Sequence, residues 1–470
     1  MENNNLDGNE NGNRTGSDNY KPLPLTDFRK YSELVSLLYR TSGALILGNS
    51  LEWLDFGLYG YSESEISSQL FGGNQTVGWF TFGLGFAFRP IGAYVLGRLS
   101  DEKSRNTSFI LAMMSMATST ALMALIPAVC NMPSVTIETY CFSSIWASAV
   151  PAVALRCVQG FSAGAAAGGV NTIQSELWST EERKGCIAQA VGVQNVSGAT
   201  ASMLAAGIVY GLRALIGDIK YAAWGWRIAF LIVVPPSLVA SYLMYRKVPE
   251  SNDYAKRNSV IRFTEEVTEE MTSRSQRNVI QDETFDNDNE EAPIIADETT
   301  NMTPLWIVLT VLTFSQFAIA AFNNLNVYLV DFAKVTYGVS PNKATSMAIV
   351  GKAIQVIMTP FAAISADIKG WYWTCIFGGT LCTILALPMM VAGQFGGVAV
   401  AWILVAAFLP IVSTFWISNA PLLITCLFPA EHRSRGTSLV LSIAAAFSGF
   451  CFVICLFRFG GMILVNFCMK

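Results

Sequence analysis

Two acidic residues lie inside the first long apolar run of the chain. Glu52 and Asp55 are three residues apart, so on a helix they share a face with Gly48 and Tyr59. Exposing either charge to lipid would cost about 2.5 to 3.5 kcal/mol on insertion scales, so we expect this face to be turned into a helix bundle. A carboxyl group whose surroundings alternate between wet and dry can take up and release a proton. The spacing predicts proton coupling or substrate contact at Glu52, Asp55 and Tyr59, with a fixed structural ion pair as the alternative.

A counter-charge for these acids occurs in the fourth apolar run. Arg156 and Gln159 are three residues apart and share a helix face. Gly160, Gly164 and Gly168 form a ridge of small residues at i, i+4 spacing, which lets another helix approach closely. An arginine inside a membrane span is a functional hypothesis by default. We therefore add Arg156 and Gln159 to the predicted coupling or substrate site, with simple neutralisation of the acids as the alternative.

Polar residues in other apolar runs supply further candidates. Arg89, in the second run, has two possible roles: it is part of the functional site, or its side chain only snorkels to the membrane surface. Lys352 is a charge and could attract an anion, whereas amide side chains at such depth commonly hold helices together, at about 0.6 kcal/mol each. The candidates for a substrate cavity in the second half of the chain are Asn323, Asn326, Lys352, Gln355, Trp416 and Asn419.

The composition places these residues in a membrane protein. Of the 470 residues, 52% are hydrophobic and 14% are charged, whereas soluble domains carry about 25% charged residues. A single histidine, His432, disfavours imidazole-based zinc sites and catalytic triads. No motif combines a nucleophile, a base and an orienting group, and no basic tract points to nucleic acid. We expect a protein that is not an enzyme and that uses no cofactor and no metal.

Apolar runs near 20 residues predict helices that cross a hydrocarbon core about 30 Å thick. Six runs precede a polar segment and five follow it, so the fold class is an all-α integral membrane protein with about eleven visible spans and a twelfth apparently missing or truncated. The predicted spans are 41–61, 76–97, 107–128, 145–172, 187–212, 226–245, 304–330, 346–366, 372–392, 398–427 and 437–457.

Polar segments divide the chain into parts. Residues 249–302 hold 14 Asp or Glu against 5 Lys or Arg and few aromatic residues, so they cannot bury enough apolar surface to fold alone. The predicted parts are a disordered cytoplasmic tail over 1–39, a six-helix bundle over 40–248, an acidic disordered cytoplasmic linker over 249–302, a five-span bundle over 303–457 and a short tail over 458–470.

Lysine and arginine in the short loops predict the orientation. Eight of them lie on the side that also receives the N-terminal tail and the acidic linker, and four lie on the other side. The richer side is predicted to be cytoplasmic, because positively charged loops stay inside. The N-terminus is therefore expected in the cytoplasm, and the plasma membrane is the default location.

Several motifs resemble those of the major facilitator superfamily. The turn GRLSDEKSR at 97–105 is similar to that superfamily's loop between helices 2 and 3, and RCVQG at 156–160 is similar to its helix 4 motif. Three further strings resemble the metabolite:proton symporters, such as the proline/betaine and dicarboxylate carriers. These strings are GNSLEWLDFGLYG at 48–60, RPIG at 89–92 and WGWRIAF at 224–230.

The resemblance implies two helical bundles that rock about a central substrate site. It also implies that Asp101 and Arg105 act as a cytoplasmic gate latch rather than as ligands, and that Glu176 and Arg183 serve the adjoining loop in a similar way. An Asp at a helix end can bond to a neighbouring helix N-terminus or a cation in one conformational state only. A simple solvated loop is the alternative for Asp101 and Glu176.

The sequence predicts a secondary active transporter that moves a small polar organic solute, such as an osmolyte, amino acid or organic acid. The expected mechanism is alternating access with proton symport, so the partners are the solute, protons and the lipid bilayer, and the proton gradient is the energy source. One alternative is a proton-independent uniporter of a sugar or an organic cation. Another is a non-transporting truncated paralogue or sensor, because one span is missing and because Ala165 and Ala166 stand where relatives commonly have Gly-Gly-Glu, so that an intramembrane acid is absent.

Overall fold

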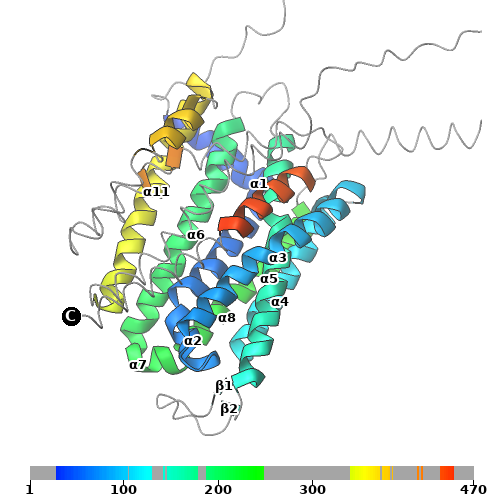
Figure 1. The fold of residues 1–470 in the computed structure, drawn as a ribbon. Helices are drawn as coiled ribbons and strands as arrows, with labels where there is room; N and C mark the ends of the chain where they lie inside the picture. Colours follow the sequence, from blue (N-terminus) through cyan, green and yellow to red (C-terminus); the bar gives the residue numbers. More distant parts are fainter. Residues whose placement is uncertain are drawn as a thin grey trace, which may run out of the picture.

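Long helices make up most of the chain that the computed structural model describes, namely residues 28–103, 105–129, 141–142, 145–177, 187–247, 339–370, 373–381, 384, 410–411, 414–415 and 435–448. The long helices have 21 to 34 residues each, enough to cross a hydrocarbon core at about 1.5 Å per residue. They are α1 (Phe28–Tyr61), α3 (Gln75–Glu102), α4 (Arg105–Leu125), α5 (Ile145–Leu177), α6 (Ile187–Ile216), α8 (Trp226–Lys247) and α11 (Pro341–Lys369) (Figure 1).

Seven of the predicted spans fall on these seven helices, and two more overlap helical residues at 373–381 and 435–448. By length and composition alone, four described segments qualify as membrane spans: Asn106–Leu125, Val191–Ile216, Asp218–Arg246 and Pro341–Lys369. Other predicted parts lie outside the described residues, so the count of eleven spans stays a prediction. These parts are span 304–330, most of span 398–427, the linker 249–302 and the tail 458–470.

Helix α1 begins earlier than the sequence predicts. The tail predicted to be disordered runs to residue 39, but residues 28–39 are helical, so the prediction is wrong for them. Leu38 is fully buried and packs with Val193 of α6. An amphipathic helix needs apolar residues on one side only, and such a pattern precedes the continuous apolar run from which the span was predicted.

Short elements connect the long helices at the end opposite the predicted cytoplasmic loops. The connections contain α2 (Glu63–Leu70), the strands β1 (Ala128–Val129) and β2 (Cys141–Phe142), which pair in parallel, α7 (Asp218–Lys220) and the π-helical turn η2 (Tyr221–Gly225). The Asn74 side chain caps α3 by accepting a hydrogen bond from Val77 N at 3.3 Å. An ion pair between Glu65 and Arg213 ties α2 to α6.

Helices α3 and α5 are in direct backbone contact. A Cβ on Gly160 would lie 1.8 Å from the carbonyl oxygen of Gly85, and a Cβ on Gly164 would lie 2.0 Å from that of Arg89. The ridge of small residues predicted from the sequence is confirmed at these two glycines. A side chain at either position would therefore overlap the backbone of α3.

Contacts between the two halves of the chain occur at several points in the described residues. Helix α11 lies alongside α6 (Figure 1), where a Cβ on Gly192 would lie 2.6 Å from Ala363 Cβ. The helical residues 435–448 reach α5, where Ser442 Oγ donates to the carbonyl oxygen of Gly164 at 3.1 Å. Elements that are distant in the sequence therefore hold the two halves together.

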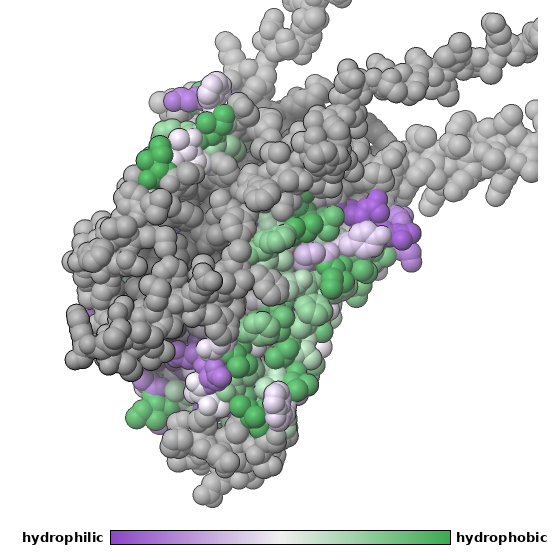
Figure 2. All heavy atoms as spheres, in the orientation of Figure 1, coloured by the Kyte–Doolittle hydropathy of each residue, from purple (hydrophilic) through white to green (hydrophobic). Residues whose placement is uncertain are grey.

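The described part of one face of the molecule is mostly apolar. Figure 2 shows hydrophobic residues over α3 and α4, with hydrophilic residues gathered at one end of these helices. Because large apolar patches are rare on soluble monomers, this face suits contact with lipid. The large exposed side chains of α3 and α4 include Ile91, Tyr94, Val95, Leu111, Met114, Leu122 and Leu125.

Candidate functional site

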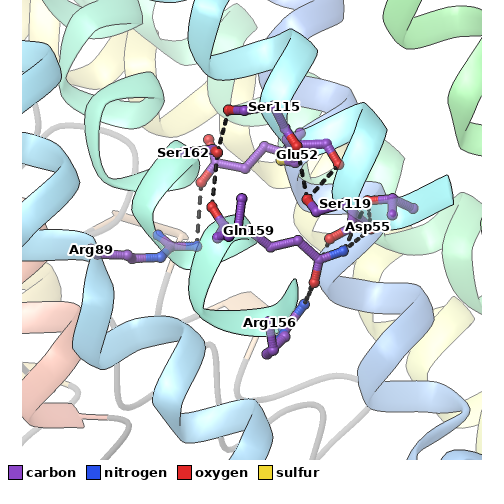
Figure 3. A network of polar contacts seen from close by, with 11 residues as sticks. Glu52, Asp55, Arg89, Ser115, Ser119, Arg156, Gln159 and Ser162 are labelled. Atoms are coloured by element: carbon purple, nitrogen blue, oxygen red, sulfur yellow. Dashed lines mark hydrogen bonds and ion pairs between the residues drawn. The ribbon is translucent and has the colours of Figure 1, made fainter. Parts of the chain in front are cut away.

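The inward face of α1 carries the acids that the sequence singles out. Glu52 is 1% exposed, and Asp55 and Tyr59 are fully buried. The prediction that this face is turned into the bundle is confirmed. Figure 3 shows the two acids among side chains from α3, α4 and α5.

Asp55 lies in a network contributed by α1, α4 and α5 (Figure 3). Its Oδ1 accepts hydrogen bonds from Thr120 Oγ1 at 2.7 Å and from Gln159 Nε2 at 3.4 Å. Arg156 Nη1 lies 3.6 Å from Asp55 Oδ2 and donates to Gln159 Oε1 at 3.0 Å. The structure thus brings the predicted residues of two helices together around one carboxylate, whose environment depends on α4 and α5 staying against α1.

Glu52 has a different partner. Arg89 of α3 is 6% exposed, and its Nη2 lies 3.3 Å from Glu52 Oε1. Among the described residues, no hydrogen-bond donor reaches either carboxylate oxygen of Glu52 in good geometry. One cation therefore balances Glu52, whereas a cation and two neutral donors hold Asp55.

The ring of Phe56 lies near both arginines. The guanidinium carbon of Arg89 is 4.3 Å from the ring centroid, and that of Arg156 is 4.5 Å from it. Arg156 also lies 4.4 Å from the ring centroid of Tyr59, whose hydroxyl donates to the carbonyl oxygen of Gly78 at 3.2 Å. Cation–π attraction strengthens when the site is desolvated, so the aromatic rings hold both guanidinium groups close to α1.

Two residues of the site were not in the predicted set. The sequence left Arg89 open between function and snorkelling, and the structure shows a buried ion pair. Thr120 was not predicted at all, because it lies among several Ser and Thr residues of one apolar run, and composition does not distinguish them. The position of α4 relative to Asp55 decides which of these hydroxyls meets the carboxylate.

The candidates in the second half are only partly described. Lys352 and Gln355 are 8% and 7% exposed, and Lys352 Nζ donates to Gln355 Oε1 at 3.0 Å. No hydrogen bond or ion pair between described residues joins them to the Asp55 network. The other four predicted cavity residues, Asn323, Asn326, Trp416 and Asn419, lie outside the described residues.

The predicted gate is described mainly by its backbone. Asp101 lies in the last turn of α3, Arg105 is the first residue of α4, and Glu176 lies in α5. Their side chains, and the whole of Arg183, lie outside the described part of the chain.

A comparable contact occurs between the halves at a residue outside the predicted set. Asp367 of α11 accepts hydrogen bonds at Oδ1 from Ala188 N, 3.2 Å away, and at Oδ2 from Gln189 N, 3.1 Å away. Asp367 therefore caps the N-terminus of α6, where a negative charge is favoured.

Membrane-length helices with acid–arginine pairs buried between them are typical of multi-pass membrane proteins with a polar site inside the bundle. The chain belongs to the Major Facilitator Superfamily, whose family model matches residues 45–453. The fold class and the superfamily predicted from the sequence motifs are therefore confirmed.

Two relatives carry names that bear on function. The chain is 33% identical over 217 residues to a citrate-proton symporter from Klebsiella pneumoniae, a match covering 45% of each protein. It is 28% identical over 232 residues to a proline/betaine transporter from Salmonella typhimurium, covering 48% of this chain and 42% of that protein. The match thus spans less than half the length of these relatives. Both are named as transporters, in line with the prediction that the chain is not an enzyme.

A solved structure has the same fold. The proton:xylose symporter XylE from E. coli, with 6-bromo-6-deoxy-D-glucose bound, superimposes with a TM-score of 0.68 at 17% sequence identity. The superposition covers 92% of this chain and 90% of that chain. At this identity the similarity shows the fold alone.

Proposed function

We propose that the protein is a proton symporter that moves a small polar organic solute, such as an osmolyte, amino acid or organic acid, by alternating access. The buried pair of Asp55 and Arg156, joined to Thr120 and Gln159, carries the proposal. A carboxyl group that changes charge between three helices can link proton movement to helix movement. The names of the citrate-proton symporter and the proline/betaine transporter support this assignment.

In the proposed cycle, the carboxyl groups of Glu52 and Asp55 take up a proton from outside. Arg156 then loses its counter-charge at Asp55, the solute occupies the cavity between the two bundles, and the helices rearrange. Loss of the proton to the inside restores the pair of Asp55 and Arg156. Tyr59 and Gln159 position the guanidinium group of Arg156 by the contacts described above.

The remaining predicted residues have places in this proposal. Asp101, Arg105, Glu176 and Arg183 form a gate at the cytoplasmic end, together with the cap that Asp367 makes on α6. The solute cavity includes residues of the second half, namely Asn323, Asn326, Lys352, Gln355, Trp416 and Asn419. The distribution of Lys and Arg in the loops supports an N-terminus in the cytoplasm, and the plasma membrane is the default location.

Uptake into proteoliposomes tests the proposal. The wild-type protein is expected to accumulate at least one solute from a panel of proline, glycine betaine, citrate, α-ketoglutarate and xylose when a pH gradient is imposed, with alkalinisation of the bath. Asp55→Asn is expected to abolish this accumulation and to retain exchange of labelled solute. Asp218→Asn, at an exposed acid of α7, is the matched control.

Two outcomes would count against the proposal. Unchanged accumulation by Asp55→Asn would remove Asp55 from the coupling role. Uptake that is independent of the pH gradient and leaves the bath pH unchanged would identify a uniporter.

A further inference from the structure

Lys352 is a buried cation whose charge the described residues leave unbalanced. Lys352 is 8% exposed, and its ammonium group donates to Gln355 Oε1 at 3.0 Å, within the same helix. No described carboxylate lies within ion-pair distance of it. Three buried arginines do have carboxylate partners, in the pairs Arg89–Glu52, Arg156–Asp55 and Arg213–Glu65.

The two residues lie on the face of α11 that packs against the first half of the chain. Lys352, Gln355 and Thr359 are buried on this face, in one stripe with Ala363 and Ala366. Ala363 meets α6 at Gly192, and Ala366 packs with α6 residues. Lys352 is eleven residues from the start of α11, or about 16 Å along its axis. The ammonium group is therefore well inside the membrane-spanning part of the molecule.

This environment suits an anion. A lysine within a membrane span marks a functional site by default, and a buried charge needs a partner of opposite sign. The amide oxygen of Gln355 provides a dipole but no charge. An ammonium group has three donors, and Gln355 takes one of them. A carboxylate next to Lys352 would accept hydrogen bonds from the remaining donors and balance the positive charge.

We propose that Lys352 and Gln355 bind a carboxylate group of the transported solute. The inference rests on the proposed function, because it requires that a solute enters between the halves. The solute would neutralise Lys352 only while it is bound, so binding would favour closure of α11 on α6. Solutes with a carboxylate would be selected over uncharged solutes of the same shape, because an amide leaves the ammonium group without its counter-charge.

Uptake kinetics and thermal stabilisation test the inference in purified, reconstituted protein. The probes are proline, glycine betaine, citrate and α-ketoglutarate, with prolinamide and xylose as solutes that lack a carboxylate. The wild-type protein is expected to bind at least one carboxylate probe, seen as uptake or as a raised melting temperature. Lys352→Gln should raise the KM for that probe at least tenfold, Lys352→Arg should keep most of the affinity, and Gln355→Leu should have an intermediate effect.

Lys343→Gln, at an exposed lysine of the same helix, is the matched control and should leave the KM unchanged. Melting temperature without solute shows whether each variant is folded, and Gln355→Leu provides the test if Lys352→Gln does not fold. Chloride added at increasing concentration to a medium without other carboxylates separates recognition of the solute from binding of an inorganic anion, because chloride should not compete with the probe.

The outcomes separate the inference from the proposed function. Proton-coupled uptake of xylose without any carboxylate probe would overturn the inference and leave proton symport standing. An unchanged KM in folded Lys352→Gln would also overturn it. Carboxylate uptake that depends on Lys352 but not on the pH gradient would support the inference and refute the symport. If no carboxylate probe is taken up and none raises the melting temperature, the inference is overturned.

Discussion

Each acid on the inward face of α1 has its own arginine, and the two pairs differ in their surroundings. Asp55 has Arg156 and two neutral donors, whereas Glu52 has Arg89 as its ion-pair partner. Removing one partner of a buried ion pair is far more costly than neutralising both, because the remaining charge is left without compensation. The stability of the site is therefore a property of pairs and not of single residues.

The pair of Glu52 and Arg89 should therefore be more sensitive to losing one charge than to losing both. Arg89→Gln should destabilise the protein by about 3 to 5 kcal/mol, because it leaves the carboxylate of Glu52 buried and unpaired. Adding Glu52→Gln to Arg89→Gln should restore most of the loss. The apparent melting temperature in detergent measures both effects.

The exposed pair of Arg98 and Glu102 on the same helix is the control. Arg98→Gln, alone or with Glu102→Gln, should leave the melting temperature unchanged, because exposed ion pairs contribute little to stability. The prediction would be contradicted if the double variant at Glu52 and Arg89 had no higher melting temperature than the Arg89→Gln variant.

At this scale the sequence predicted the charges better than their partners. Asp55 and Arg156 were identified because a charged group in an apolar run is rare, and Gln159 because it shares a helix face with Arg156; the structure brings all three together. Arg89 stayed open, because its depth in the membrane does not follow from its place in the sequence. Thr120 was missed because burying a hydroxyl in a helix costs little free energy, since the hydroxyl can form a hydrogen bond with the backbone of its own helix.

At the scale of elements, the site depends on how closely α3 approaches α5. Gly164→Val should destabilise the protein by about 1 to 3 kcal/mol or prevent folding, because the new side chain would overlap the backbone of α3 at Arg89. Gly211→Val makes the same exchange on α6, where nothing lies within 4 Å, and should be tolerated. Melting temperature and the yield of monodisperse protein measure the difference. Equal behaviour of the two variants would show that the contact between α3 and α5 does not limit stability.

The sequence predicted the long helices well and their ends poorly. Apolar runs predicted all seven long helices, because a membrane span needs continuous apolar residues. The start of α1 at Phe28 and the eight-residue helix α2 were not predicted. Both segments are amphipathic or polar. Their helical structure depends on packing against neighbouring helices, which hydropathy along the sequence does not reveal.

At the scale of the whole molecule, the contact between α6 and α11 joins the two halves. Gly192→Leu should act as a wedge there, because a Cβ on Gly192 would already lie 2.6 Å from that of Ala363. We expect uptake to fall at least tenfold while the protein stays folded. We also expect reduced cross-linking between cysteines placed at Ala188 and Ala366, which pack together in one cluster.

Gly207→Leu is the matched control for the wedge, because nothing lies within 4 Å of Gly207 on the same helix. The Gly207→Leu variant should transport solute and form the cross-link as well as the same protein without this substitution. Both measurements require a background without the native cysteines. Full cross-linking in Gly192→Leu would show that the halves still close at this end and would contradict the prediction.

The ring of Phe56 lies between 4 and 5 Å from two guanidinium groups, one from each buried pair. A quadrupole that attracts two ions is a shared electronic element, and it can be weakened in graded steps without changing shape. Progressive ring fluorination of Phe56 would withdraw π density from Arg89 and Arg156 at once. A linear decline of transport rate with the number of fluorine atoms would then identify this one side chain as the electrostatic bridge between the two pairs.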